Sequence, residues 1–245
     1  MKIKDLLMTA AFLTMSGVTM AQTTITAGNA KFVSDNEACL TYYYTNSKAM
    51  GGFQMVVSLP KGVTLEENEE KTELVINGST ASADFFNVTV PSGFECIGVK
   101  ADGAGETSDG TSYDAGDVLL VCFPVKSGAK YKATNKASLL CTLTLTTSGT
   151  ANLKNVAIKG FTGSDTNGTG GETTAQYVAS AGSKTSPSKV LKEGDANNDD
   201  YIDIGDIDYV IEAIGGDYFT YEDADVNADN DINIGDIDFI IERIK

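Results

Sequence analysis

The sequence predicts a mainly β protein, in which a β-sandwich is followed by a small all-α module. From residue 24 to about residue 156, short apolar or alternating runs are separated by Gly, Asn, Asp and Ser, without a helical period. From residue 194 onward, an acidic loop followed by an apolar helical stripe occurs twice, thirty residues apart. The stretch between the two parts contains Gly, Pro and several Ser, which is typical of a linker. We therefore divide the mature chain into residues 22–180, 181–193 and 194–245.

The first residues have the features of an export signal. Lys2 and Lys4 precede an apolar run over residues 6–18, and Ala21 ends a small-residue cleavage motif. The run is too short to be a permanent membrane span. We expect residues 1–21 to be removed and the mature bacterial protein to be secreted, periplasmic or associated with the cell surface.

The first part of the mature chain contains eight candidate strands. They are residues 38–44, 52–59, 73–76, 86–90, 95–100, 118–125, 138–146 and 152–158. Short strands at this spacing indicate a β-sandwich. Residues 101–115, rich in Gly, Ser and Asp, and residues 162–174, rich in Gly and Thr, are expected to be exposed loops.

Four cysteines remain after export, in segments that resemble strands. They are Cys39, Cys96, Cys122 and Cys141, and an oxidising compartment permits them to pair. Three connectivities are possible. Cys141 shares its strand parity with Leu143, so a buried free thiol is the alternative to a bridge.

The composition argues against several classes of function. The formal net charge of −16 opposes binding to nucleic acid or anionic lipid, because both are bound mainly through Lys and Arg. Histidine is absent, which removes the usual general base of serine and cysteine hydrolases and the usual nitrogen ligand of zinc. Glu66 and Glu67 are of the residue type that glycosidases use in pairs, but adjacent acids are typical of a solvated loop. We expect the protein not to be an enzyme.

The motif that carries chemistry is a pair of acidic loops with matching oxygen-bearing residues. Side-chain oxygens fall at loop positions 1, 3, 5, 9 and 12, and the main-chain carbonyl at position 7 completes the spacing of a calcium loop. The first loop offers Asp195, Asn197, Asp199, Tyr201, Asp203 and Asp206, and the second offers Asp225, Asn227, Asp229, Asp231, Asn233 and Asp236. We predict one Ca²⁺ ion in each loop, with Asp203 binding through water. Because clustered carboxylates repel one another, ion binding and folding should be coupled.

An apolar stripe at positions i, i+3, i+4 and i+7 follows each loop and predicts a helix with one apolar face. The stripes are Ile207, Val210, Ile211 and Ile214 in the first repeat and Ile237, Ile240, Ile241 and Ile244 in the second. We expect the stripes to pack against each other, with Ile202 and Ile232 added from the loops, because neither helix alone buries enough surface to be stable.

Each repeat consists of a loop and the helix after it, with little room for a helix before the loop. In this, residues 194–245 resemble a dockerin, the calcium-dependent module that docks onto cohesin domains in bacterial polysaccharide-degrading assemblies. The resemblance implies a cohesin-type protein as the partner.

The sequence departs from the dockerin pattern at two places. Position 6, where a positive φ normally requires Gly, is Asp200 in one loop and Asn230 in the other. Asp and Asn tolerate this conformation best among the other residues, so calcium binding should survive. Positions 10 and 11, where many dockerins carry Ser or Thr that contact the cohesin, are Ile and Gly in both repeats, so the type of cohesin stays open.

The resemblance also suggests a partner-binding surface at positions 10 and 11 and on the helix residues outside the apolar stripes. Its members are Ile204, Gly205, Asp208, Tyr209 and Glu212 in the first repeat and Ile234, Gly235, Asp238, Phe239 and Glu242 in the second. Tyr209 and Phe239 would anchor such a surface. The alternative is an ordinary solvated helix surface.

Residues 51–63 and 116–125 resemble the early and middle strands of cohesin-like and related carbohydrate-binding sandwiches. The resemblance implies a jelly-roll-type sandwich that acts as a scaffold or adhesion domain and binds a dockerin or a glycan; a sandwich without such activity is the alternative. Tyr42, Tyr43 and Tyr44 are candidates for a sugar-stacking surface. Alternating tyrosines of this kind are more typical of a core.

We therefore expect a noncatalytic assembly or adhesion protein that docks onto a cohesin-type partner through a module folded by two Ca²⁺ ions. The alternative is a carbohydrate-binding protein whose dockerin-like module only determines its location.

Overall fold

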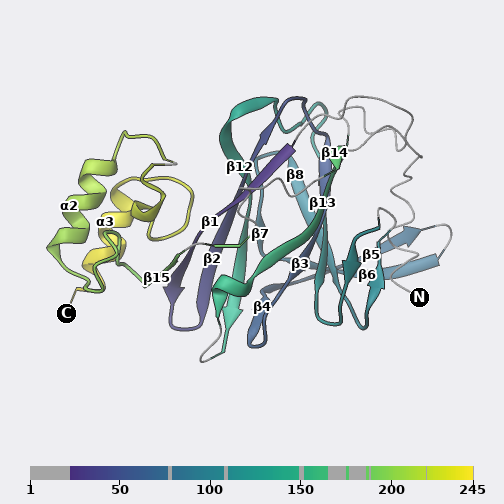
Figure 1. Ribbon diagram of the computed structural model, residues 1–245, viewed down its shortest axis with the longest axis horizontal. Helices are drawn as coiled ribbons and strands as arrows, with labels where there is room; N and C mark the ends of the chain where they lie inside the picture. Colours follow the sequence, from purple (N-terminus) through teal and green to yellow (C-terminus); the bar gives the residue numbers. More distant parts are fainter. Residues whose placement is uncertain are drawn as a thin grey trace.

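The structure is a computed structural model that describes residues 23–76, 79–107, 110–148, 152–164, 175–176, 186–187, 189–218 and 220–244. The predicted export signal and most of residues 165–185 lie outside this part of the chain. Two large sheets pack around one core, and two short helices lie beside them (Figure 1). The prediction of a mainly β protein is confirmed.

The first sheet is centred on β2, Glu37–Asn46, which pairs with β1, Thr23–Ser34, on one side and β12, Thr134–Thr147, on the other. Its order is β15-β1-β2-β12-β4, and β7 also pairs with β12. The short members are β4 (Val63–Leu65), β7 (Val88–Thr89) and β15 (Val190–Leu191). All pairings are antiparallel except that of β15 with β1.

The second sheet has the order β14-β13-β3-β11-β8-β6-β5. Its strands are β14 (Ala175–Gln176), β13 (Ala157–Ser164), β3 (Gly52–Ser58), β11 (Val118–Pro124), β8 (Phe94–Lys100), β6 (Ser79–Phe86) and β5 (Glu67–Ile76). A small hairpin of β9, Gly105–Glu106, and β10, Ser112–Tyr113, interrupts the stretch expected to be a loop.

The core lies between the two sheets because alternate residues of the central strands point inward. Leu40 and Leu143 come from the first sheet and Val57 and Leu120 from the second, and all four are almost fully buried. Tyr131 closes the core at one edge, where its hydroxyl donates to the Leu140 carbonyl at 3.2 Å and rings from both sheets surround it.

The cysteines divide into one bridge and two thiols. Cys96 and Cys122 face each other across β8 and β11, with Cα atoms 4.2 Å apart, and form a disulfide. Cys39 and Cys141 are free, and Cys141 is fully buried, as its parity with Leu143 suggests.

Most of the predicted strands coincide with observed ones. The sequence did not predict β4 or most of β6, and two further regions differ. Residues 152–158 do not form one strand: a 3-10 helix, η1 (Leu153–Asn155), precedes β13, and the Asn152 side chain caps it by accepting from Lys154 N at 3.1 Å. β1 was not predicted because Gly28 and Asn29 interrupt its apolar pattern; a register shift lies there, between Ala27 and Ala30.

The C-terminal part contains two helices, α2 (Ile204–Ala213) and α3 (Ile234–Ile241), joined through a short 3-10 helix, η2 (Glu222–Ala224). Part of the predicted linker is not a free connection, because β15 lies within it and pairs with β1. Leu191 of β15 is 2% exposed. No helix in the described part of the chain is long and apolar enough to cross a membrane.

Candidate metal-binding loops

The two acidic loops share an unusual backbone conformation. Among the described residues, Asn198, Asp200, Ala228 and Asn230 are the non-glycine residues with positive φ, at 60°, 76°, 59° and 69°. They occupy positions 4 and 6 of each loop. A non-glycine residue in this region is uncommon and costs free energy, so its recurrence at equivalent positions shows that both loops adopt the same turn. The expectation of positive φ at position 6 is confirmed.

The first and last acids of each loop hold it together through main-chain hydrogen bonds. Asp195 Oδ1 accepts from Asp199 N and Oδ2 from Asp200 N, both at 3.0 Å. Asp206 accepts from Asn197 N at 3.1 Å and from Asp203 N at 2.9 Å. These contacts fold position 12 back against the main chain near position 1, although the two positions are eleven residues apart in sequence.

The second loop repeats this arrangement. Asp225 accepts from Asp229 N at 3.1 Å and from Asn230 N at 3.2 Å. Asp236 accepts from Asn227 N at 3.3 Å and from Asn233 N at 3.0 Å. The agreement extends from sequence to geometry, so the two loops are one structural motif used twice.

Position 9 has a local role at the start of each helix. Asp203 and Asn233 are the N-caps of α2 and α3, and they accept from Gly205 N at 2.7 Å and Gly235 N at 2.6 Å. The acid at position 12 completes a capping box at both helices. A side chain at Gly205 would lie 3.1 Å from the Asp203 carboxylate, so glycine at position 11 has a structural reason independent of any partner.

Positions 3 and 5 lie side by side. Asn197 Nδ2 donates to Asp199 Oδ2 at 3.2 Å, and Asp199 Oδ1 accepts from Tyr201 N at 3.0 Å. The second loop has the equivalent contacts at 3.1 and 2.9 Å. The Tyr201 side chain is 70% exposed, which agrees with a contribution from its main chain rather than its ring.

The loops bury negative charge. Asp195, Asp206, Asp225 and Asp236 are each at most 1% exposed. Burial raises the pKa of Asp195, and it raises that of Asp236 to about 6, with repulsion from Asp225 and Asp229 adding to the effect. Buried carboxylates of this kind need a compensating cation, and a donor set made only of oxygens suits a hard divalent ion.

The described residues contain no group of three or more His, Cys, Asp or Glu side chains gathered as a metal centre. The predicted donor sets also depend on an amide oxygen at position 3 and a main-chain carbonyl at position 7. The two Ca²⁺ ions therefore stay a prediction.

The helices bury only part of the predicted apolar stripes. Val210, Ala213 and Ile240 form the small core of this region with Ala196, Ala224 and Val226. Ile202, Ile207, Ile232 and Ile237 pack against it as expected. The other predicted core residues, Ile211, Ile214, Ile241 and Ile244, are 56%, 45%, 55% and 39% exposed. That part of the prediction is wrong, because each helix packs against loop residues and η2 rather than along the full stripe of the other helix.

The predicted partner-binding surface divides into two groups. Ile204 and Ile234 are 66% and 65% exposed, and Asp208, Glu212, Asp238 and Glu242 are exposed as well. Tyr209 and Phe239 instead pack against the small core. The Tyr209 ring lies 6.1 Å from that of Tyr221, and the Arg243 guanidinium covers the Phe239 ring at 3.3 Å. These aromatic residues are therefore not free anchors, whereas Ile204 and Ile234 are exposed.

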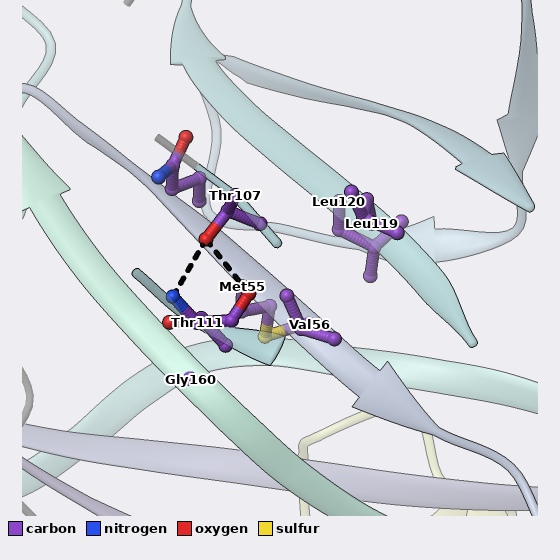
Figure 2. Close-up of a pocket in the computed structure, with 8 residues that line it drawn as sticks. Met55, Val56, Thr107, Thr111, Leu119, Leu120 and Gly160 are labelled. Atoms are coloured by element: carbon purple, nitrogen blue, oxygen red, sulfur yellow. Dashed lines mark hydrogen bonds between the residues drawn. The ribbon is translucent and has the colours of Figure 1, made fainter. Parts of the chain in front are cut away.

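The sandwich offers no aromatic platform at the position suggested by sequence. Tyr42, Tyr43 and Tyr44 are 0%, 4% and 5% exposed, so their interpretation as a sugar-stacking surface is wrong. Figure 2 shows a cavity beside β3 and β11, over which Thr107 and Thr111 are hydrogen-bonded. Its volume of about 10 Å³ is close to that of a single water site, which is too small for a sugar.

No protein-family model matches the chain, and no curated protein matches it at a significant level. The functional interpretation therefore depends on the geometry of the two loops and the surfaces around them.

Proposed function

We propose that the protein is an exported, noncatalytic assembly protein whose C-terminal module, residues 194–245, folds around two Ca²⁺ ions and docks onto a cohesin-type partner. The observation that carries this proposal is the pair of loops with matching positive φ at positions 4 and 6 and matching hydrogen bonds at positions 1 and 12. Two acidic loops that bound no ion would have no physical reason to adopt the same strained turn.

Each loop contains the donors that one Ca²⁺ ion requires. In the first loop, Asp195, Asn197, Asp199 and Asp206 would bind through side-chain oxygens and Tyr201 through its carbonyl, with Asp203 acting through water while it caps α2. The second loop would use Asp225, Asn227, Asp229, Asp231, Asn233 and Asp236 in the same order. The ion supplies positive charge to carboxylates that are already buried, so calcium should stabilise the folded module strongly.

The partner would bind the exposed isoleucines of the two helices. Ile204, Asp208 and Ile211 lie on one face of α2, because they are four and three residues apart, and Ile234, Asp238 and Ile241 repeat this on α3. All four isoleucines are more than half exposed. Exposure of large aliphatic side chains to water is unfavourable. Flanked by acids, they form a suitable surface for a protein partner with an apolar centre and a basic rim.

The sandwich would display or link the module rather than carry out chemistry. We propose a cohesin-like, jelly-roll-type arrangement for it, supported by the two-sheet core and by β15, which returns to pair in parallel with β1. The tyrosine cluster of the sandwich is buried, so it does not support carbohydrate binding.

Calcium titration of the mature chain tests the proposal. We expect heat, a gain of helix and a rise in the unfolding temperature, with two ions bound per chain. Asp195→Ala combined with Asp225→Ala should abolish all three effects and also abolish calcium-dependent capture of a partner from the cell envelope.

The matched control is Asp208→Ala combined with Asp238→Ala, which removes the same charge from exposed helix positions. This control should bind both ions like the natural chain. A natural chain that takes up calcium without heat or change in helix would refute the proposal, and so would a double loop variant that still captures the partner.

A further inference from the structure

The second repeat of the C-terminal module lies against the first sheet of its own sandwich. In Figure 1 the segment between α2 and α3 faces β1 and β2. Asn29 connects β1 to η2: its main-chain N donates to Glu222 Oε1 at 2.6 Å, and its Nδ2 donates to Asp223 Oδ1 at 2.7 Å. Lys189, which precedes β15, forms an ion pair with Asp223 at 3.0 Å.

Lys31 of β1 reaches the second loop itself. Its side chain is buried, and its ammonium donates to the main-chain carbonyls of Glu222 and of Asp225, the latter at 2.7 Å. Nζ also lies 3.4 Å from Asp225 Oδ2. A buried ammonium is stable only with such partners. Since Asp225 is position 1 of the loop, the sandwich places a positive charge beside the first predicted calcium ligand.

Position 6 of the second loop is also held by the sandwich. Thr142 of β12 donates to Asn230 Oδ1 at 3.0 Å, and the Thr41 hydroxyl of β2 lies 2.9 Å from that of Thr142. In the first loop the residue at position 6 is Asp200, whose exposed carboxylate pairs with Lys192. A neutral amide at Asn230 suits two hydroxyl groups on a sheet, whereas the Asp200 carboxylate suits solvent and an exposed lysine.

Small and aromatic residues complete the contact. A side chain added at Gly28 would lie 3.0 Å from the Tyr43 ring and 3.1 Å from the Glu222 carboxylate, so the two parts meet here without room for a larger residue. The rings of Tyr43 and Tyr218 are 6.4 Å apart, and the Tyr218 hydroxyl donates to Asp225 Oδ2.

The first loop has no equivalent support. Within the described residues, no Lys or Arg forms an ion pair with Asp195, although this carboxylate is as buried as that of Asp225. Two loops with the same donors therefore lie in different surroundings.

We propose that the sandwich binds the second repeat of its own chain and uses Lys31 as a built-in cation at the second loop, so that the two loops respond unequally to calcium. The second loop keeps its conformation without the ion. It binds Ca²⁺ more weakly than the first loop, because Lys31 repels a second cation close to Asp225. The first loop has only the exposed Lys192 beside it and therefore depends more on the ion. The unequal affinities rest on the proposed function, whereas the contact between sandwich and repeat does not.

Hydrogen exchange of the mature chain in a chelator tests the contact. Main-chain amides of residues 226–232 should exchange at least about ten times more slowly than those of residues 196–202, since the sandwich opposes their local opening. Lys31→Met should remove this difference. Thr142→Val, which deletes one hydroxyl from a folded strand, should speed exchange around Asn230 even if Lys31→Met destabilises the whole chain.

Lys192→Met is the control, because it removes the exposed lysine that pairs with Asp200 of the first loop and should leave the difference intact. Equal exchange in the two loops of the natural chain, or an unchanged difference in Lys31→Met and Thr142→Val, would overturn the contact. In a calcium titration, two sites of unequal affinity are expected, and Lys31→Met should tighten the weaker one on the order of tenfold. Two equal sites in the natural chain would overturn the unequal response. A preserved exchange difference without any calcium heat would support the contact and refute the proposed function.

Discussion

Asp206→Ala should unfold the C-terminal module while the sandwich stays folded. The Asp206 side chain is fully buried, accepts two main-chain hydrogen bonds and completes the capping box of α2. Its removal leaves the N–H groups of Asn197 and Asp203 without their acceptor. It also removes one oxygen from the predicted calcium shell.

The magnitude follows from these contacts. A hydrogen bond to a charged acceptor contributes about 1.5–3 kcal/mol, so the two together contribute about 3–6 kcal/mol. A domain of this size has a free energy of unfolding of only about 3–8 kcal/mol. The substitution should therefore remove most of the stability of the module. Asp206→Asn keeps one acceptor oxygen and similar volume, so it should lose about half as much.

Urea unfolding in saturating calcium, followed by far-ultraviolet circular dichroism for the helices and by hydrogen exchange of the β2 and β12 amides for the sandwich, measures the effect. Asp208→Ala is the matched control, because Asp208 is exposed on the same helix and its loss should change stability by less than about 0.5 kcal/mol. If Asp206→Ala and Asp208→Ala shifted the helix transition equally, the structural role of position 12 would be refuted.

Three further predictions concern other parts of the molecule. Burial raises the pKa of both free thiols, that of Cys39 to about 11. At about pH 8 the native chain should therefore react with a thiol reagent far more slowly than the unfolded chain, and rapid labelling of the native chain would contradict this. The unfolded chain should show two thiols before reduction and four after it. Burial raises the pKa of Glu222 above 4.5, so the folded chain takes up a proton at this carboxylate more readily than the unfolded chain. The contribution of Glu222 to stability should therefore grow as the pH falls through the raised pKa toward 4.5. Glu222→Gln should flatten that part of the plot of urea midpoint against pH, and an unchanged plot would count against this prediction. Ile204→Asp combined with Ile234→Asp should weaken partner capture at least about tenfold without changing the heat of calcium binding, because both side chains are exposed; undiminished capture would show that the partner binds elsewhere.

The sequence predicts the β class and the central strands well because a sheet with one buried face imposes a period of two on its residues. β12 shows this period over residues 143–147, whereas β3 and β11 are nearly continuous apolar runs, because side chains on both of their faces are buried. β1 and β15 were not predicted, and the reason lies in their neighbours. β1 is covered by the C-terminal module, which buries Lys31, a residue that local patterning places in solvent. β15 consists of two residues whose pairing with β1 depends on contacts made far away in sequence.

The loops were predictable for the opposite reason, since their conformation is encoded within twelve residues. Oxygen-bearing side chains at fixed offsets gather main-chain N–H groups locally, and Asp or Asn at position 6 tolerates the required φ. The helix faces were less predictable. A run of isoleucines satisfies several helical stripes at once, and only the packing of Val210 and Ile240 against η2 and the loops decides which stripe is buried.

This separation between local and distant causes explains how a repeated sequence comes to have two different environments. The donors of both loops are set by the repeat, and on sequence alone the module has near-twofold symmetry. Only the second loop has Asn at position 6, and only the second loop lies against two threonines and a buried lysine of the sandwich. Exchanging Asn230 for Asp would place a carboxylate against Thr142 beside an already acidic loop, whereas Asp200→Asn would remove only an exposed ion pair. The first exchange should therefore weaken the contact between sandwich and module, and the second should not, so the difference at position 6 is itself a consequence of which repeat the sandwich holds.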